Sequence, residues 1–336
     1  MPRKSRIDAP GALHHVIVKG IEGRQIFADE EDRRSFLGRL EKSLVRDRTP
    51  CYAWALLPNH VHLLLETGRK PVGRVMQSVL TGYALAFNRR HQRTGHLFQN
   101  RFKSILCERE AYLLELIRYI HLNPLRAGLV SGISALDLYP WSGHSVLMGH
   151  RGMKWQAMDE VLGLFGKRMG EARGGYRRFV EEGISMGRRS DLTGGGLVRS
   201  LGGWEAVAEA RRNREWQAYD ERILGSGDFV VRALREAEEK EKMRSRLRRD
   251  GWVYSRVLAC AAKAAGISPR GVFGPGKRAP QSLGRSLACK WLVEDLGLTQ
   301  SEVARRLGIT QQAVGQCIPR GSALEKKLGI RLGAGE

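Results

Sequence analysis

The chain has 336 residues, enough for two or three domains, and 42% of them are hydrophobic and 27% charged. This composition is typical of a soluble globular protein and excludes a disordered or fibrous chain. No apolar run approaches the roughly 18 residues needed to span a bilayer, and the basic opening residues are not followed by an apolar segment. We therefore expect a cytoplasmic protein that binds no membrane.

The charge balance is strongly basic. Lys and Arg total 57 against 35 Asp and Glu, which gives a net charge of +22. Such an excess favours a polyanionic partner, and nucleic acid is the usual polyanion of the cytoplasm, so nucleoid association is expected. A basic membrane-surface protein is the alternative, but it needs a basic amphipathic helix with an aromatic face, which the sequence lacks. Five scattered cysteines without a CxxC pair argue against a disulfide framework or a zinc ribbon.

The first 150 residues predict alternating strands and helices. We expect strands at 14–20, 51–57, 60–67 and 95–107, and helices at 29–47, 72–91 and 108–123. Pro124 should end the last of these helices, because proline disfavours helical geometry in the residue before it. The order β-α-β-β-α-β-α predicts an α+β fold, a ferredoxin-like antiparallel sheet with helices on one face.

The rest of the chain predicts helices. Residues 146–250 are rich in Arg and Glu with clustered glycines, which indicates a helical middle region that ends in a solvated helix and linker. From residue 251 to about 330 the pattern is that of a compact all-α domain. We therefore expect three parts, residues 1–145, 146–250 and 251–330.

The stretch "ALLPNHVHLLLE" (residues 55–66) places two histidines in an otherwise apolar strand. Side chains alternate along a strand, so His60 and His62 share one face and can reach one divalent metal ion. The alternative is that both are hydrogen-bonded polar residues on a half-buried face.

A second motif, "IRYIHLNP" (residues 117–124), offers two further groups. Tyr119 and Asn123 are four residues apart, so they lie one turn apart on the same helix face. Tyrosine can act as a phenolic nucleophile, and an asparagine carbonyl is an oxygen ligand for Mg²⁺ or Mn²⁺. The alternatives are a core role for Tyr119 and a helix-terminal role for Asn123.

Together "PNHVHLLL", "GHLFQNRFKS" (residues 95–104) and "RYIHLNP" resemble the REP-associated tyrosine transposases, single-tyrosine HUH nucleases with an IS200-like transposase domain. The resemblance covers about residues 8–145 and implies the HUH nuclease fold. It implies that His60, His62 and Asn123 hold Mg²⁺ or Mn²⁺, although relatives in the wider transposase group carry glutamine in place of Asn123. It also implies that Tyr119 attacks DNA to form a 5′-phosphotyrosine.

The implied enzyme nicks and joins single-stranded DNA beside a hairpin. Tyr112 lies seven residues before Tyr119, on nearly the same helix face, and is the alternative nucleophile. Two other hypotheses stay open: a DNA-binding regulator with a vestigial nuclease site, and a metal-dependent phosphohydrolase without a covalent step. A homodimer is also an open alternative.

Residues 67–107 contain no acidic residue. Cations with interleaved aromatic residues are typical of a groove for single-stranded nucleic acid. The candidate DNA-binding residues are Arg69, Lys70, Arg74, Arg89, Arg90, Arg93, Arg101 and Lys103. The interleaved aromatic residues are Tyr83, Phe87, Phe98 and Phe102. The alternative is that the aromatic residues belong to the core and the cations to a solvated face.

"LTQSEVARRLGITQQAVGQCI" (residues 298–318) predicts a helix-turn-helix for duplex DNA. Thr299 caps the first helix, with Glu302 placed for a capping box, and Gly308 makes the turn. The recognition helix, 310–318, would offer Thr310, Gln311, Gln312 and Gln316 to a major groove. Residues 253–320 resemble the C-terminal DNA-binding domain of the bacterial replication initiator, without its Arg-Asp-His-rich recognition sequence. Such units also serve protein contacts, which is the alternative here.

Overall fold

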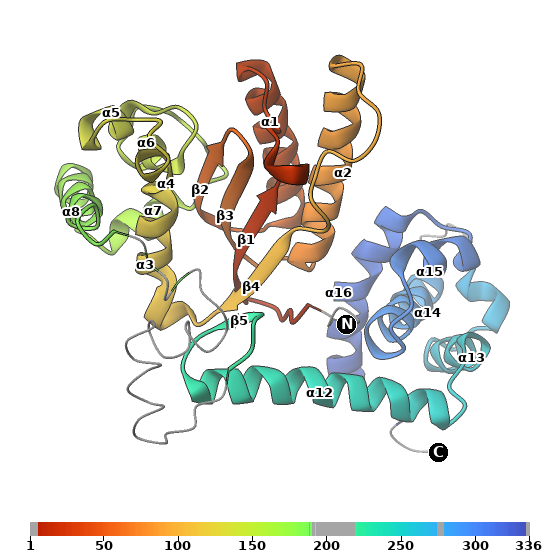
Figure 1. Ribbon diagram of the computed structural model, residues 1–336. Coiled ribbons are helices and arrows are strands. Elements are labelled where there is room, and N and C mark those ends of the chain that lie inside the picture. The colour runs from red at the N-terminus through yellow and green to blue at the C-terminus, as the bar shows by residue number, and fades with distance from the viewer. Residues whose placement is uncertain (1–5, 188, 190–191, 193–218, 274–278, 334–336) are drawn as a thin grey trace. The chain divides into compact units, whose positions relative to one another are not determined.

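The computed structural model describes residues 6–187, 189, 192, 219–273 and 279–333 of the chain (Figure 1). Two compact units divide the chain, Met1–Ala233 and Leu234–Glu336. The first contains a β-sheet, and the second is helical in its described part. Every helix within these ranges is too short or too polar to cross a membrane.

The first unit is built on a five-stranded sheet in the order β2-β3-β1-β4-β5. The strands are β1 (Leu13–Lys19), β2 (Cys51–Leu57), β3 (His60–Glu66), β4 (Lys103–Cys107) and β5 (Ile223–Leu224). All neighbours are antiparallel except β4 and β5. The order of the first four strands is the one that a β-α-β-β-α-β chain adopts in a ferredoxin-like fold, so the predicted fold class is confirmed.

Helices α1 (Glu30–Asp47) and α2 (Val72–Arg90) cover one face of the sheet, where they bury a core with the side chains of Val16, Val18 and Leu63. Acidic residues in the first turn of α1, and the Asp29 carboxylate that accepts the Asp32 amide at 3.0 Å, set the start of that helix.

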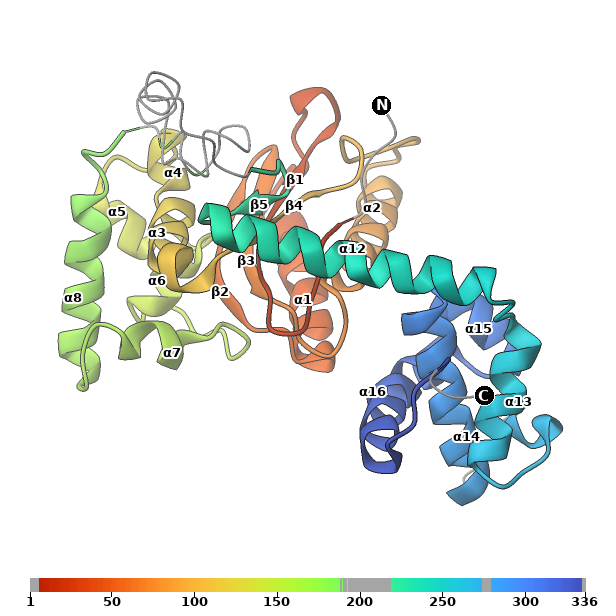
Figure 2. The same ribbon diagram turned by 90° about the horizontal axis from the view of Figure 1, so that it is seen from below.

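Helix α3 (Arg109–His121) was predicted as a helix, but it packs on the opposite face of the sheet, where a second core forms (Figure 2). The sequence predicted helices on one face only. The short helices that follow extend this layer: α4 (Asn123–Arg126), α5 (Ile133–Leu138), α6 (Gly143–Leu147), α7 (Met158–Gly163) and α8 (Met169–Glu182). The predicted stop at Pro124 is displaced. Helix α3 already ends at His121, and Pro124 stands in the first turn of α4, where the missing N–H costs no hydrogen bond.

A buried chain of hydrogen bonds ties α3 to the later helices. The hydroxyl of Tyr176 on α8 lies 2.6 Å from His121 Nδ1 and 3.0 Å from His144 Nδ1. His144 Nε2 lies 2.8 Å from the Asp137 carboxylate, which also accepts Arg177 Nε at 2.8 Å. These bonds tie the end of α3 to α5, α6 and α8.

Helix α12 (Gly227–Arg249) spans the boundary between the units, and its charged side chains are largely exposed, as predicted for this segment. The second unit then contains α13 (Tyr254–Ala264), α14 (Ala279–Lys290), α15 (Gln300–Leu307) and α16 (Gln311–Leu328), with short turns η2 (Pro269–Val272) and η3 (Trp291–Asp295). These helices enclose a separate core. Helices α14 and α16 approach closely at Gly321, where an added Cβ would lie 2.2 Å from the Ser286 carbonyl oxygen.

Candidate active site

A pocket of about 850 Å³ lies on the first unit, between strands β1 and β3 and helices α3 and α4. All four residues that the sequence singled out for chemistry line it: His60, His62, Tyr119 and Asn123. They come from two segments almost sixty residues apart, so the fold, and not sequence proximity, brings them together.

The alternation of side chains along β3 places His60 and His62 on the same face of the sheet. Leu63 and Leu65 belong to the core under α1 and α2, whereas Leu64 belongs to the core under α3. His60 and His62 occupy the positions that alternate with Leu63 and Leu65, so their side chains point to the α3 side of the sheet. Their ring centroids are 5.1 Å apart. His62 is only 5% exposed and His60 is half-buried.

One nitrogen of each ring is already engaged. His62 Nδ1 lies 2.9 Å from Nε2 of His15, a fully buried residue on β1. His60 Nδ1 lies 2.7 Å from the side-chain oxygen of Asn59. The Nε2 atoms of both site histidines are therefore the ones left for a ligand, and this second layer of contacts fixes the ring orientations. The sequence reasoning missed His15, because its contact depends on the pairing of β1 with β3.

The environment keeps both rings neutral. Burial, aided by the nearby Lys19 cation, lowers the pKa of His60 to about 4. Burial also lowers the pKa of His62 well below its usual value, and the neighbouring His15 and His60 add to the effect. Neutral imidazole is the form that binds metal ions, so the rings need no proton loss at pH 7.

Tyr119 stands beside this histidine pair. Its ring meets those of His62 and His15 edge-on, each at a centroid distance of 5.9 Å. Tyr112, the alternative nucleophile, packs against the α3-side core and does not line the pocket. The geometry therefore favours Tyr119.

Asn123 begins α4 and is 8% exposed. Its side-chain Nδ2 donates to the Ile120 carbonyl at 3.4 Å, so its amide oxygen is the atom left to face the pocket. In the described part of the chain, no three His, Cys, Asp or Glu side chains form a metal-binding group. A metal at this pocket would therefore take two imidazole nitrogens and one amide oxygen, donors that suit a divalent ion completed by water.

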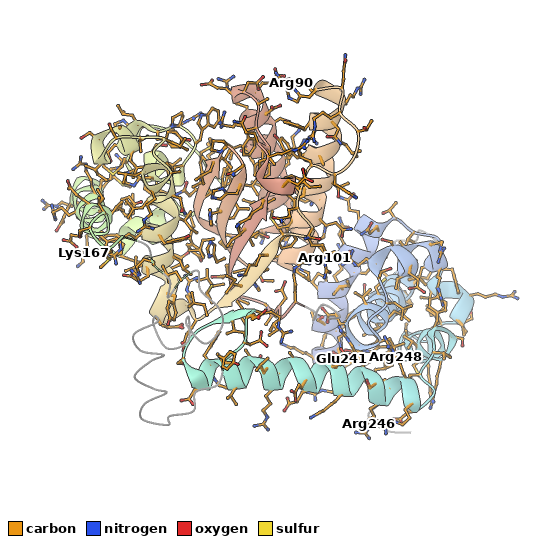
Figure 3. All side chains as sticks on the ribbon, in the orientation of Figure 1. Arg90, Arg101, Lys167, Glu241, Arg246 and Arg248 are labelled. Carbon is orange, nitrogen blue, oxygen red and sulfur yellow. The ribbon has the colours of Figure 1, made fainter. Side chains whose placement is uncertain are left out.

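The cations of the acid-free segment separate into three groups. Arg101 and Lys103 line the pocket, together with Lys19, Arg126 and Arg189. Others are neutralised within the protein. Arg90, labelled in Figure 3 at the end of α2, pairs with Glu31 and Asp32 of α1 and with Asp29, which caps that helix. Lys70 Nζ lies 3.0 Å from Asp47.

The remaining cations of this segment, Arg69, Arg74, Arg89 and Arg93, do not line the pocket. The aromatic residues of α2 serve the core. Tyr83 and Phe87 are buried, and the Tyr83 hydroxyl donates to the Ile26 carbonyl at 2.5 Å. Phe98 and Phe102 are partly buried against the same core. For Tyr83 and Phe87 the structure therefore favours the alternative, a role in the core, because packing beside α1 removes their ring faces from solvent.

The second unit forms the expected pair of helices around a glycine turn. Thr299 Oγ1 accepts the Glu302 amide at 3.2 Å, and the Glu302 carboxylate accepts from Arg306 at 2.7 Å. Gly308 adopts φ 66°, and Thr310 caps α16 by accepting the Ala313 amide. Helix α16 continues to Leu328, ten residues beyond the predicted end. The residues expected to face a major groove are all exposed: Thr310, Gln311, Gln312 and Gln316.

Comparison with known proteins adds an independent finding. Residues 11–123 match the family model described as transposase IS200 like. A solved structure of a REP-associated tyrosine transposase bound to a REP hairpin is 17% identical and covers 47% of this chain and 92% of its own, with a TM-score of 0.37. A candidate transposase from Deinococcus radiodurans R1 is 17% identical and covers 35% and 95%, with a TM-score of 0.26. None of the curated proteins matches the chain.

Proposed function

We propose that this chain, which belongs to the IS200-like transposase family through residues 11–123, nicks and rejoins single-stranded DNA through a covalent tyrosine intermediate. Membership makes it an enzyme that acts on DNA. The observation that carries the finer proposal is the meeting of His60, His62, Tyr119 and Asn123 in one pocket lined by cations.

The residues present fit a divalent metal ion, Mg²⁺ or Mn²⁺. His60 Nε2, His62 Nε2 and the Asn123 amide oxygen would hold it, because the other polar atoms of these side chains are engaged. A metal bound there supplies Lewis-acid polarisation of a phosphate oxygen. The neutral state of both histidines and the contact from His15 to His62 support this assignment.

The protein's own nucleophile is the Tyr119 hydroxyl. Its oxygen attacks the scissile phosphorus and loses its proton, the P–O3′ bond breaks, and the departing O3′ takes up a proton. The products are a 5′-phosphotyrosine and a free 3′-hydroxyl. A phenol has a pKa near 10, so the cations around the pocket favour the step by stabilising developing negative charge. Attack by another 3′-hydroxyl reverses the step and joins DNA without ATP.

The substrate proposed is a hairpin with an adjoining single strand. A REP hairpin is bound in one of the solved structures compared above, and the pocket of this chain is rimmed by Lys19, Arg101 and Lys103, which suit a phosphate backbone. Residues 1–145 would form the nuclease domain and 146–250 a helical middle region. Residues 251–330 would bind duplex DNA through α16, whose exposed glutamines can reach base edges.

A covalent-adduct assay tests the proposal. Full-length protein is incubated with 3′-labelled hairpin DNA and Mg²⁺ or Mn²⁺, because a 5′-phosphotyrosine keeps the strand that carries the 3′ label, and the adduct is resolved on a denaturing gel. Wild type and the matched control Tyr112→Phe should form it, whereas Tyr119→Phe should bind DNA and form none. His60→Ala, His62→Ala and added EDTA should each suppress the adduct, and Asn123→Ala should have a milder effect because water can replace the amide oxygen.

Adduct formation in EDTA would contradict the metal-dependent mechanism. An adduct that survives in Tyr119→Phe and disappears in Tyr112→Phe would reassign the nucleophile. DNA binding by the wild type without any adduct would favour a regulator with a vestigial site.

A further inference from the structure

Arg126, which the sequence analysis did not single out, lies beside the proposed nucleophile. Its guanidinium carbon is 5.3 Å from the centroid of the Tyr119 ring, and its side chain lines the same pocket. Its backbone amide donates to the Leu122 carbonyl at 3.0 Å, and Pro124 restricts the turn between them. The backbone of Arg126 is therefore held at a fixed place relative to the end of α3.

Among the described residues, none supplies a counter-charge to this guanidinium. Across the residues that the structure describes, no Asp or Glu lies within ion-pair distance of Arg126, and its Nη1 atom is buried without a hydrogen-bond partner. Arg189 lines the same pocket, but its Nη1 donates to Glu115 at 2.6 Å. Arg118 is likewise paired with Glu115.

Arg126 is half-buried, and withdrawing part of a cation from water without an anion is unfavourable, so an anionic ligand bound in this pocket would relieve that cost. Arginine presents a planar fork of donors that matches the oxygens of a phosphate. The anion expected at this pocket, beside a nucleophilic tyrosine, is a phosphodiester.

We infer that Arg126 is a catalytic residue that binds a non-bridging oxygen of the scissile phosphate. The inference rests on the proposed function, which brings that phosphorus to the Tyr119 oxygen. As the O–P bond to Tyr119 forms and the P–O3′ bond breaks, negative charge grows on the non-bridging oxygens, and the guanidinium stabilises it while staying protonated.

The first measurement needs no cleavage. In a Tyr119→Phe background, fluorescence anisotropy compares the binding of a hairpin oligonucleotide with that of the same oligonucleotide carrying a neutral methylphosphonate at the scissile position. With Arg126 present the methylphosphonate should weaken binding about tenfold, a loss appropriate to one charge-assisted contact. With Arg126→Gln the two oligonucleotides should bind alike. Arg178→Gln, the same charge change at an exposed site on α8, should behave as the background does. An equal methylphosphonate effect with and without Arg126 would overturn the inference.

The second measurement is the single-turnover rate at saturating DNA. Removing one donor to a developing oxyanion costs roughly 10²–10³-fold in rate, so Arg126→Gln should lose about that much, and Arg126→Lys should recover part of it. A rate within threefold of wild type in Arg126→Gln would refute the catalytic role. Circular dichroism checks the fold, and Arg126→Lys keeps the test decisive if Arg126→Gln misfolds. If wild type forms no adduct while the binding difference persists, the proposed function fails and the phosphate contact of Arg126 stands.

Discussion

Replacing His15 by leucine should weaken metal binding without touching any proposed ligand. His15 Nε2 lies 2.9 Å from His62 Nδ1, and both side chains are buried. If His62 held a metal through Nε2, its Nδ1 would carry the ring proton and donate a hydrogen bond to His15 Nε2. Leucine removes that acceptor and leaves a buried donor unsatisfied, a cost of about 1–3 kcal/mol. Loss of such a contact typically weakens metal affinity roughly 10- to 100-fold.

The assay is a titration of the full-length protein with Mn²⁺, followed by the electron paramagnetic resonance signal of the free ion, without DNA. His15→Gln is the matched control, because its amide oxygen can take the place of Nε2 and should restore most of the affinity. His62→Ala should lose binding far more severely. If His15→Leu binds Mn²⁺ as tightly as wild type while remaining folded, the orienting role of His15 is refuted. If wild type binds no Mn²⁺, the metal site itself is wrong.

Three further predictions concern stability and DNA affinity. Gly321→Ala should destabilise the second unit by about 1–3 kcal/mol or more, because the new Cβ would lie 2.2 Å from the Ser286 carbonyl oxygen. Gly38→Ala in α1 has open space around the new Cβ and should stabilise the first unit by about 0.5–1 kcal/mol. Thermal unfolding curves of both variants measure these changes. Burial lowers the pKa of His144, so the unfolded chain takes up a proton near pH 6.5 that the folded one refuses. The free energy of unfolding should therefore fall as the pH drops below about 6.5, and urea titrations at pH 7.5 and 5.5 that give equal values would contradict this. Finally, a fragment of residues 234–336, which contains its own core, should bind duplex DNA and cleave nothing, with affinity that falls steeply with salt; no duplex binding at low salt would reassign this unit to protein contacts.

Local patterns predicted most of the elements and the pair of histidines at the centre of the pocket. The alternation of apolar residues around His60 and His62 sets which face they occupy, whatever the partner strand is. The spacing of Tyr119 and Asn123 likewise gave their common direction, although the structure divides them between α3 and α4. Element ends agree within about two residues where a capping or turn residue marks them, as at Asp29 and Gly308.

Contacts between residues that are far apart in the sequence could not be predicted from local patterns. His15 reaches His62 only through the antiparallel register of β1 and β3, which no local pattern specifies. Arg90 reads as a DNA-binding cation in a segment without acids, yet the carboxylates of α1 neutralise it across a helix pair. Arg126 could be recognised as a candidate site residue only from the structure, in which the turn after α3 places it at the pocket.

The position of Tyr112 outside the pocket limits what one copy of the protein can hold. Within the described residues, Tyr119 is the sole tyrosine that lines the site, and all four proposed site residues belong to the same chain. On the proposed chemistry, each copy is complete for one cut and can carry one 5′ end at a time. A strand exchange in which two cut 5′ ends are covalently bound to protein at the same time therefore requires two copies, whereas a nick that is then resealed requires one. The number of protein copies in the reacting complex would then equal the number of 5′ ends that are held covalently at one time.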